Sequence, residues 1–204
     1  MNGKYLPLLL GGLAFLAGVV SSNATNYDGR WWLSIDQQQR DGFVYGFVVC
    51  YSNLVDHKLF QESYRTYTTR LNGYLRAHPE SLAEPVENTL RSMASPPFAK
   101  PVHRPAPNET PKEYTVKWGA NNDGDEWRGA TSWNLGYVEG FLECYSRDTK
   151  SEYGTFSKPP EWYANAIANC YGVKADDPAK INPSRENEKI PEVLFRFRDK
   201  PEAR

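Results

Sequence analysis

The fold depends on one stretch of sequence, GFVYGFVVCYS at residues 42–52, which recurs as GYVEGFLECYS at residues 136–146. The two segments are identical at seven of their eleven positions, and their first residues are 94 positions apart (136 minus 42). Each segment also follows a tryptophan, Trp32 or Trp127, at a similar distance. Such self-similarity indicates that one structural unit occurs twice in the chain.

Both segments have the apolar periodicity of a helix. Residues at positions i, i+3, i+4 and i+7 share one helical face. These positions hold Phe43, Gly46, Phe47 and Cys50 in the first segment, and Tyr137, Gly140, Phe141 and Cys144 in the second. We therefore predict a helix over each segment, and we expect the first to start at a capping box formed by Ser34 and Gln37.

Two glycines spaced four residues apart lie within each predicted helix. Each costs about 1 kcal/mol in a helix interior relative to alanine, so their presence needs a reason. We predict that they let another backbone approach closely; the alternative is a local bend of the helix. The predicted helix-packing residues are Gly42, Gly46, Phe47, Gly136, Gly140 and Phe141.

A second helix and a shorter third element are predicted in each unit. Apolar stripes mark these elements, and proline and glycine mark their ends. The predicted elements are residues 64–78 and 81–93 in the first unit, the latter starting at a capping box at Ser81, and residues 160–172 and 190–197 in the second. Residues 173–189 are polar and rich in proline and asparagine, which predicts a long loop.

The chain divides into five segments on these grounds. Six prolines between Pro96 and Pro111 are typical of a stiff, extended linker. The predicted organisation is a signal peptide at 1–24, a first helical unit at 25–95, a proline-rich linker at 96–126, a second helical unit at 127–197 and a disordered tail at 198–204. The predicted fold class is all-α, with two tandem small helical bundles related by an internal repeat.

The N-terminus has the pattern of an export signal. Lys4 precedes an almost wholly apolar run from Tyr5 to Val20, and small residues at Ser22 and Ala24 form a cleavage site. The alternative, an uncleaved membrane anchor, needs roughly 20 apolar residues, which is more than this run provides. We expect a periplasmic or secreted protein with no membrane segment after signal cleavage.

The charge composition excludes some partners. The formal net charge is −1, with 24 basic and 25 acidic residues mixed along the chain. Because no basic patch stands out, neither nucleic acid nor an anionic membrane surface is an expected partner.

Three cysteines, Cys50, Cys144 and Cys170, would enter an oxidising compartment after export, so at least one disulfide is expected. Only the second unit has a cysteine on both of its first two helices. We predict a Cys144–Cys170 bridge, which stabilises the fold by about 3 kcal/mol in the loop-entropy model, with Cys50 as a buried free thiol. The rival pairing is Cys50–Cys144 across the two units, because connectivity is not readable from sequence.

No pattern in the sequence predicts a catalytic, cofactor or metal site. The three histidines lack metal-ligand spacing. Residues 121–125 match the start of a calcium loop, but Glu126 takes the place of its essential glycine. Glu139 and Glu143 stand four residues apart, yet no partner groups for acid–base catalysis are identifiable. The residues predicted to line solvated or partner-facing edges are Asp123, Asp125, Glu126, Glu139 and Glu143.

The first unit resembles a known family. The pattern GFVYGF at residues 42–47, followed by LNGYLRAHPE at residues 71–80 and a short closing helix, is similar to the Rap/Tai family of bacterial periplasmic immunity proteins associated with type VI secretion. The second unit carries the first motif but lacks the Tyr-Leu-x-x-His-Pro-Glu ending.

The resemblance implies a function. The best-known members of the family block peptidoglycan-cleaving amidases, often as dimers that place a loop in the enzyme's cleft. A protein-binding module is therefore expected, with a cell-wall amidase effector as its partner, acting as a homodimer or as a pseudo-dimer within one chain. The expected contact loops are residues 121–126 and 147–158. The alternatives are a structural or envelope-associated periplasmic protein, and an enzyme of unfamiliar type that uses Asp125, Glu139 or Glu143.

Overall fold

The computed structural model describes residues 26–94, 127, 131–148, 154–173 and 182–199. Over these residues the chain forms seven α-helices, one 3-10 helix and isolated β-bridges, and no longer strand. The predicted all-α class is therefore confirmed for the part that the structure describes. The predicted signal peptide, the predicted linker at 96–126 and the last five residues of the chain lie outside it.

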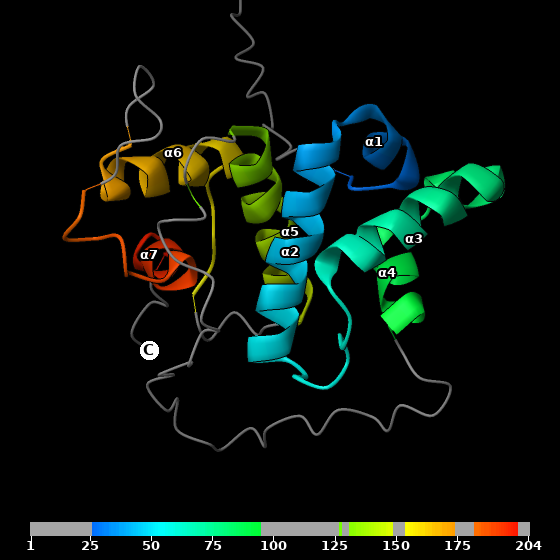
Figure 1. The fold of residues 1–204 in the computed structure, drawn as a ribbon, viewed down its shortest axis with the longest axis horizontal. Coiled ribbons are helices and arrows are strands. Elements are labelled where there is room, and N and C mark those ends of the chain that lie inside the picture. The colour runs from blue at the N-terminus through cyan, green and yellow to red at the C-terminus, as the bar shows by residue number, and fades with distance from the viewer. Residues whose placement is uncertain (1–25, 95–126, 128–130, 149–153, 174–181, 200–204) are drawn as a thin grey trace, which may run out of the picture.

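Two long helices form the centre of the molecule. They are α2 (Gln37–Leu54) and α5 (Thr131–Asp148), which contain the two similar segments and pack side by side (Figure 1). Both run in the same direction, because Gly42 lies against Trp133 and Gly46, one turn later, lies against Tyr137. The C-termini of α2 and α5 therefore lie at the same end of the pair.

Each long helix carries a smaller helical arm (Figure 1). The arm of α2 is formed by α3 (Tyr64–Ala77), η1 (Pro79–Ala83) and α4 (Val86–Ala94). The arm of α5 is formed by α6 (Pro160–Tyr171) and α7 (Ile190–Arg196). Figure 1 shows the two arms on opposite sides of the central pair.

The ends of α3 and α6 follow the predicted signals. α3 ends at Ala77 with His78 as its C-cap, because Pro79 disfavours helical backbone in the residue before it. α6 ends at Tyr171, and its C-cap, Gly172, adopts a left-handed φ of +72° that suits glycine. The predicted capping box at Ser81 is wrong, because Ser81 lies inside η1 and α4 begins only at Val86.

The start of α2 also differs from the prediction. Its N-cap is Asp36, whose carboxylate accepts a hydrogen bond from the backbone N–H of Gln39 at 2.8 Å. The predicted cap, Ser34, is instead the last residue of α1 (Gly29–Ser34), a helix that the sequence did not predict. α1 is stabilised by Asp28, which accepts hydrogen bonds from two backbone N–H groups of its first turn. A six-residue helix is too short to display a helical period.

Aromatic side chains fill the core between α2 and its arm. Phe47 is fully buried and stacks against Tyr51, with ring centroids 6.0 Å apart. Phe60, from the loop after α2, meets Tyr67 of α3 edge to face at 5.3 Å. Such edge-to-face pairs are a favoured aromatic geometry and add to the burial of the rings.

The core between α5 and its arm has the same ring arrangement. Phe141 is fully buried and stacks against Tyr145 at 6.4 Å. Phe156, from the segment before α6, meets Tyr163 of α6 edge to face at 5.2 Å. The stacked pair and the edge-to-face pair thus recur on the two sides of the central pair, but Phe141 also meets Phe195 of α7, whereas Phe47 meets Phe60 and lies under Arg91.

The second arm extends beyond its predicted end. Asp199 and Thr155 exchange two backbone hydrogen bonds of 2.8 and 3.1 Å. Residues 198 and 199, which were predicted to belong to the disordered tail, are thus part of this arm. Residues 182–189 form turns, in keeping with the predicted loop at 173–189, of which residues 174–181 lie outside the described part.

Candidate functional site

The inner pair of predicted packing glycines lies where α2 touches α5. A Cβ added at Gly46 would stand 2.0 Å from the carbonyl oxygen of Tyr137, and one added at Gly140 would stand 1.9 Å from that of Phe43. Real Cβ atoms do not come this close to a backbone oxygen. The hydrogen that replaces the Cβ therefore points at the facing carbonyl, a geometry that permits weak Cα–H···O contacts.

The outer glycine pair repeats this contact one turn earlier. A Cβ added at Gly42 would stand 2.1 Å from the carbonyl oxygen of Trp133, and one added at Gly136 would stand 2.1 Å from that of Gln39. Four backbone contacts of this kind fix the two helices against each other. The two helices are therefore closely packed along these turns.

Two cysteines continue the glycine stripe. Cys50 lies one turn after Gly46, and Cys144 lies one turn after Gly140. Both thiols are fully buried, and the two side chains interact with each other. Burial raises the pKa of both thiols, because a thiolate loses its hydration there.

The predicted Cys144–Cys170 bridge is not formed in the structure, where all three cysteines are free thiols. Cys144 faces Cys50, whereas Cys170 is half-buried on α6 and its Sγ lies 4.0 Å from Nη1 of Arg185. The physical reason is the stripe itself, which turns Cys144 toward α2 and away from the arm.

Glu139 lies against α2 and not on the solvent-facing edge that the sequence suggested. Only 5% of its surface is exposed, and its Oε2 accepts a hydrogen bond of 2.8 Å from Nε2 of Gln39. Burial raises the pKa of Glu139 to about 7. The hydrogen bond from Gln39 opposes this shift, and the charge of Glu161 adds to it.

A group of five charged side chains joins α4 to α5, and we call it the α4–α5 charge cluster: Glu87, Arg91, Glu143, Arg147 and Asp148. Arg147 contacts Glu87 at 2.9 Å and Glu143 at 2.7 Å. Arg91 pairs with Asp148 and, at 3.4 Å, with Glu87. Burial raises the pKa of Glu87 and of Glu143, and the arginines partly oppose it. Glu143 is therefore an ion-pair partner within the fold.

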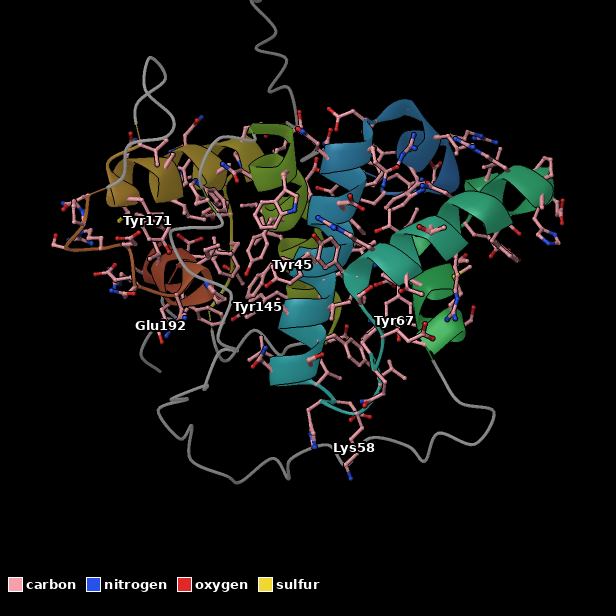
Figure 2. All side chains as sticks on the ribbon, in the orientation of Figure 1. Tyr45, Lys58, Tyr67, Tyr145, Tyr171 and Glu192 are labelled. Atoms are coloured by element: carbon pink, nitrogen blue, oxygen red, sulfur yellow. The ribbon has the colours of Figure 1, made fainter. Side chains whose placement is uncertain are left out.

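The loop that leaves the C-terminus of α2, residues 55–63, is exposed at its tip and anchored at its base. His57 and Lys58 are exposed, and Figure 2 shows Lys58 projecting away from the helices. Leu59 and Phe60 are buried beneath them. The tip is a tight turn, because Asp56 accepts a hydrogen bond of 2.8 Å from the backbone N–H of Lys58.

A tyrosine hydroxyl holds the base of this loop. The Oη of Tyr67, on α3, accepts hydrogen bonds from the backbone N–H groups of Gln61 at 3.1 Å and Glu62 at 3.3 Å. The side chain of Gln61 also donates to the carbonyl oxygen of Lys58 at 2.7 Å. The loop is thus hydrogen-bonded at its tip and at its base, and such ordering before binding lowers the entropy lost on binding a partner.

The segment before α6 is anchored in the same way. The Oη of Tyr163 accepts a hydrogen bond of 3.1 Å from the backbone N–H of Lys158. Next to it, Trp162 is 43% exposed. Among the large apolar side chains of the residues that the structure describes, it is the exposed one. Both anchored segments follow the C-termini of parallel helices, so they start from the same end of the central pair.

The residues predicted to contact a partner are only partly described. Asp123, Asp125 and Glu126 lie outside the described residues, as do residues 149–153 of the predicted loop at 147–158. Sequence reasoning missed the loop at 55–63. The internal repeat could have predicted it. The predicted contact loop at 147–158 follows the second repeated segment, and residues 55–63 follow the first segment at a similar position.

The described residues contain no group of three or more His, Cys, Asp and Glu side chains that could hold a metal ion. Among the helices that the structure describes, none is long and apolar enough to cross a bilayer. Comparison with known proteins finds no matching family model, and no curated protein or solved structure matches the chain.

Proposed function

We propose that the chain is an exported protein-binding module built as a pseudo-dimer of two helical units, and that it acts as an immunity-type inhibitor of a peptidoglycan-cleaving amidase. The observation that carries the proposal is the anchored loop at residues 55–63, presented at one end of a closely packed helix pair. The sequence motifs at residues 42–47 and 71–80 supply the type of partner.

The reciprocal glycine contacts support the pseudo-dimer. Gly42 faces Trp133 and Gly136 faces Gln39, and both differences, 136 minus 42 and 133 minus 39, are 94. Exchanging the two copies thus converts one contact into the other. This reciprocity is the property of an isologous interface, in which each of two like subunits gives and receives the same contacts.

The recurring aromatic geometry supports the same view. Tyr67 and Tyr163 both accept hydrogen bonds from the loop that precedes their helix, and both meet a phenylalanine of that loop edge to face. In this proposal one chain supplies both units of a dimer. The purified mature chain should then have the mass of a monomer in light scattering, and a stable homodimer would contradict it.

The binding function is tested by capture from a periplasmic extract. The immobilised mature chain should retain one protein in equimolar amount, and that protein should cleave peptidoglycan amide bonds and lose this activity in the complex. Capture of no protein would contradict the binding function. Capture of a protein without wall-cleaving activity would contradict the inhibitor role.

The loop is tested with two matched charge reversals. Lys58→Glu changes the exposed tip and should weaken the captured complex about tenfold or more, since it places a wrong charge within the interface. Glu192→Lys is the control, because Glu192 is also exposed but lies on α7, well apart from Lys58 (Figure 2). Equal affinities for the two variants would remove the loop from the interface.

A further inference from the structure

Cys50 and Cys144 form a matched pair of thiols between the two central helices. Each lies eight residues after the first glycine of its stripe, since 50 minus 42 and 144 minus 136 are both eight. Neither side chain is exposed, and the two interact with each other across the interface. The glycine contacts at the preceding turns bring the two backbones together.

Cys170 has a different environment. It lies on α6, is partly exposed, and its sulfur contacts the guanidinium of Arg185 at 4.0 Å. A bridge from Cys144 to Cys170 would require Cys144 to turn away from Cys50 and out of the helix interface. Of the pairings open to the three thiols, Cys50 with Cys144 therefore needs the least rearrangement.

We propose that Cys50 and Cys144 are oxidised to a disulfide that joins α2 to α5. The oxidant is a disulfide compound, either a small one such as glutathione disulfide or a protein with a reactive disulfide. One cysteine thiolate attacks it, forms a mixed disulfide and releases one thiol. The second cysteine then displaces the other half of the oxidant as a thiol, so that the chain loses two protons and two electrons and the oxidant gains them.

The burial of the pair determines when this reaction occurs. Within the folded helix pair the thiols are inaccessible to an oxidant and their ionisation is disfavoured. Oxidation therefore takes place before α2 closes on α5, or when the two separate. Once formed, the bond joins the two halves of the chain independently of the connection between α4 and α5.

The inference rests on the export that the proposed function includes but not on its binding role, and mass spectrometry of the full mature chain tests it. The chain is exported to an oxidising compartment and alkylated under denaturing conditions without reductant. Apart from the mass of the alkyl groups, it should be lighter than the reduced chain by two hydrogen atoms. Its peptides should include one that links Cys50 to Cys144, and Cys170 should be alkylated. Alkylation of all three cysteines, or a link that includes Cys170, would overturn the inference.

Serine variants provide the matched controls. Cys170→Ser should keep the link, whereas Cys50→Ser and Cys144→Ser should each lose it. A second measurement tests the role of burial: glutathione disulfide should oxidise the reduced, folded chain about tenfold more slowly than the chain in denaturant, because the buried thiols are protected. Equal rates in the two states would overturn the proposed order of folding and oxidation.

Discussion

Glu139 carries a carboxyl group in a place where its charged form is costly. Because burial raises its pKa from 4.5 to about 7, the folded chain holds a proton there that the unfolded chain releases between these values. The contribution of Glu139 to stability is therefore complete below pH 4.5 and is lost as the pH rises through about 7. The neutral acid still accepts the hydrogen bond from Gln39.

Because the contribution of Glu139 to stability is lost as the pH rises, the substitution Glu139→Gln has a predictable effect. Glutamine keeps the acceptor for Gln39 and does not ionise, so the variant should exceed the wild type in free energy of unfolding by about 3 kcal/mol at pH 8. At pH 4.5 the two should be nearly equal. Urea unfolding of both chains at the two pH values measures the difference, and a gain that is the same at both would contradict the assigned pKa.

Arg91 is a second residue whose surroundings allow a prediction. It pairs with Asp148 and Glu87, and only 4% of Glu87 is exposed. Arg91→Leu keeps apolar contact with the rings of Phe47 and Tyr51. It removes the positive charge that pairs with Glu87 and Asp148. We expect a loss of about 3 kcal/mol in the free energy of unfolding, as for broken buried ion pairs.

A matched control for Arg91 lies in the second arm. Arg196 pairs with Glu188 at 2.9 Å, but Arg196 is exposed and Glu188 is only half-buried, whereas Glu87 in the first pair is buried. Arg196→Leu should therefore cost less than about 1 kcal/mol. Chemical denaturation of the two variants under the same conditions compares them. A smaller loss for Arg91→Leu than for Arg196→Leu would show that the α4–α5 charge cluster does not stabilise the fold.

At the scale of the helix, the glycines of α2 and α3 make a clean comparison. Gly46→Ala places a methyl group against the backbone of Tyr137 and should destabilise the chain by about 3 kcal/mol, because two backbones must move apart. Gly73→Ala introduces the same methyl group into α3, where no atom lies within 4 Å of it. It should stabilise the chain by about 0.5–1 kcal/mol.

Thermal and urea unfolding followed by far-ultraviolet circular dichroism would measure both glycine variants. The expected changes have opposite signs although the substitution is the same, so general effects of alanine on helices are excluded. If Gly46→Ala also stabilised the chain, the close contact between α2 and α5 would be wrong, and the bend of the helix at these glycines would be the better interpretation of the repeated spacing.

The helices themselves could be predicted where their pattern was long enough. The stripes around Phe47 and Tyr67, the stop at Pro79 and the cap at Gly172 are local signals, and local signals are readable from one sequence. α1 was missed because six residues carry no period. The cap of α2 was misplaced because Ser34 and Asp36 are both good N-caps, and only the geometry of α1 decides between them.

The contacts of the candidate site could not be predicted in the same way. Gln39 meets Glu139, and Arg91 meets Asp148, across 100 and 57 residues of sequence respectively. No local period reports such a pairing, since it depends on how α5 is turned against α2 and α4. The sequence could only show that acidic residues interrupt the second segment, and an exposed edge was the simplest interpretation.

For the whole molecule, the two sides of the central helix pair differ in their side chains. Tyr45 stacks obliquely on Trp133 at 5.7 Å, and the positions 94 residues away from these two are Glu139 and Gln39 (45 plus 94, 133 minus 94). One side of the pair thus holds two rings, where the other holds a carboxyl group and an amide. Figure 2 shows Tyr45 at the junction of α2 and α5. The similar halves are therefore not interchangeable.

The extent of the α2–α5 contact leads to a prediction about the whole chain. If a protease site is inserted within residues 96–126 and cut, the two parts should stay together in gel filtration under reducing conditions, at the mass of the uncut chain. The glycine contacts hold the backbones of Phe43 and Tyr137 against the opposite helix, and Tyr45 packs on Tyr137 across the interface. The α4–α5 charge cluster adds ion pairs across the same boundary. Separating the parts would expose both surfaces to water.

The reductant and a glycine variant make this measurement specific. Reduction removes any Cys50–Cys144 bond, so association after the cut reports non-covalent packing alone. The same cut in the Gly46→Ala variant should release more of each part, because the added methyl group forces α2 away from Tyr137. Complete separation of the reduced wild-type parts would mean that α2 and α5 are held together by the connection between them, and the two arms would then be independent units on a common tether.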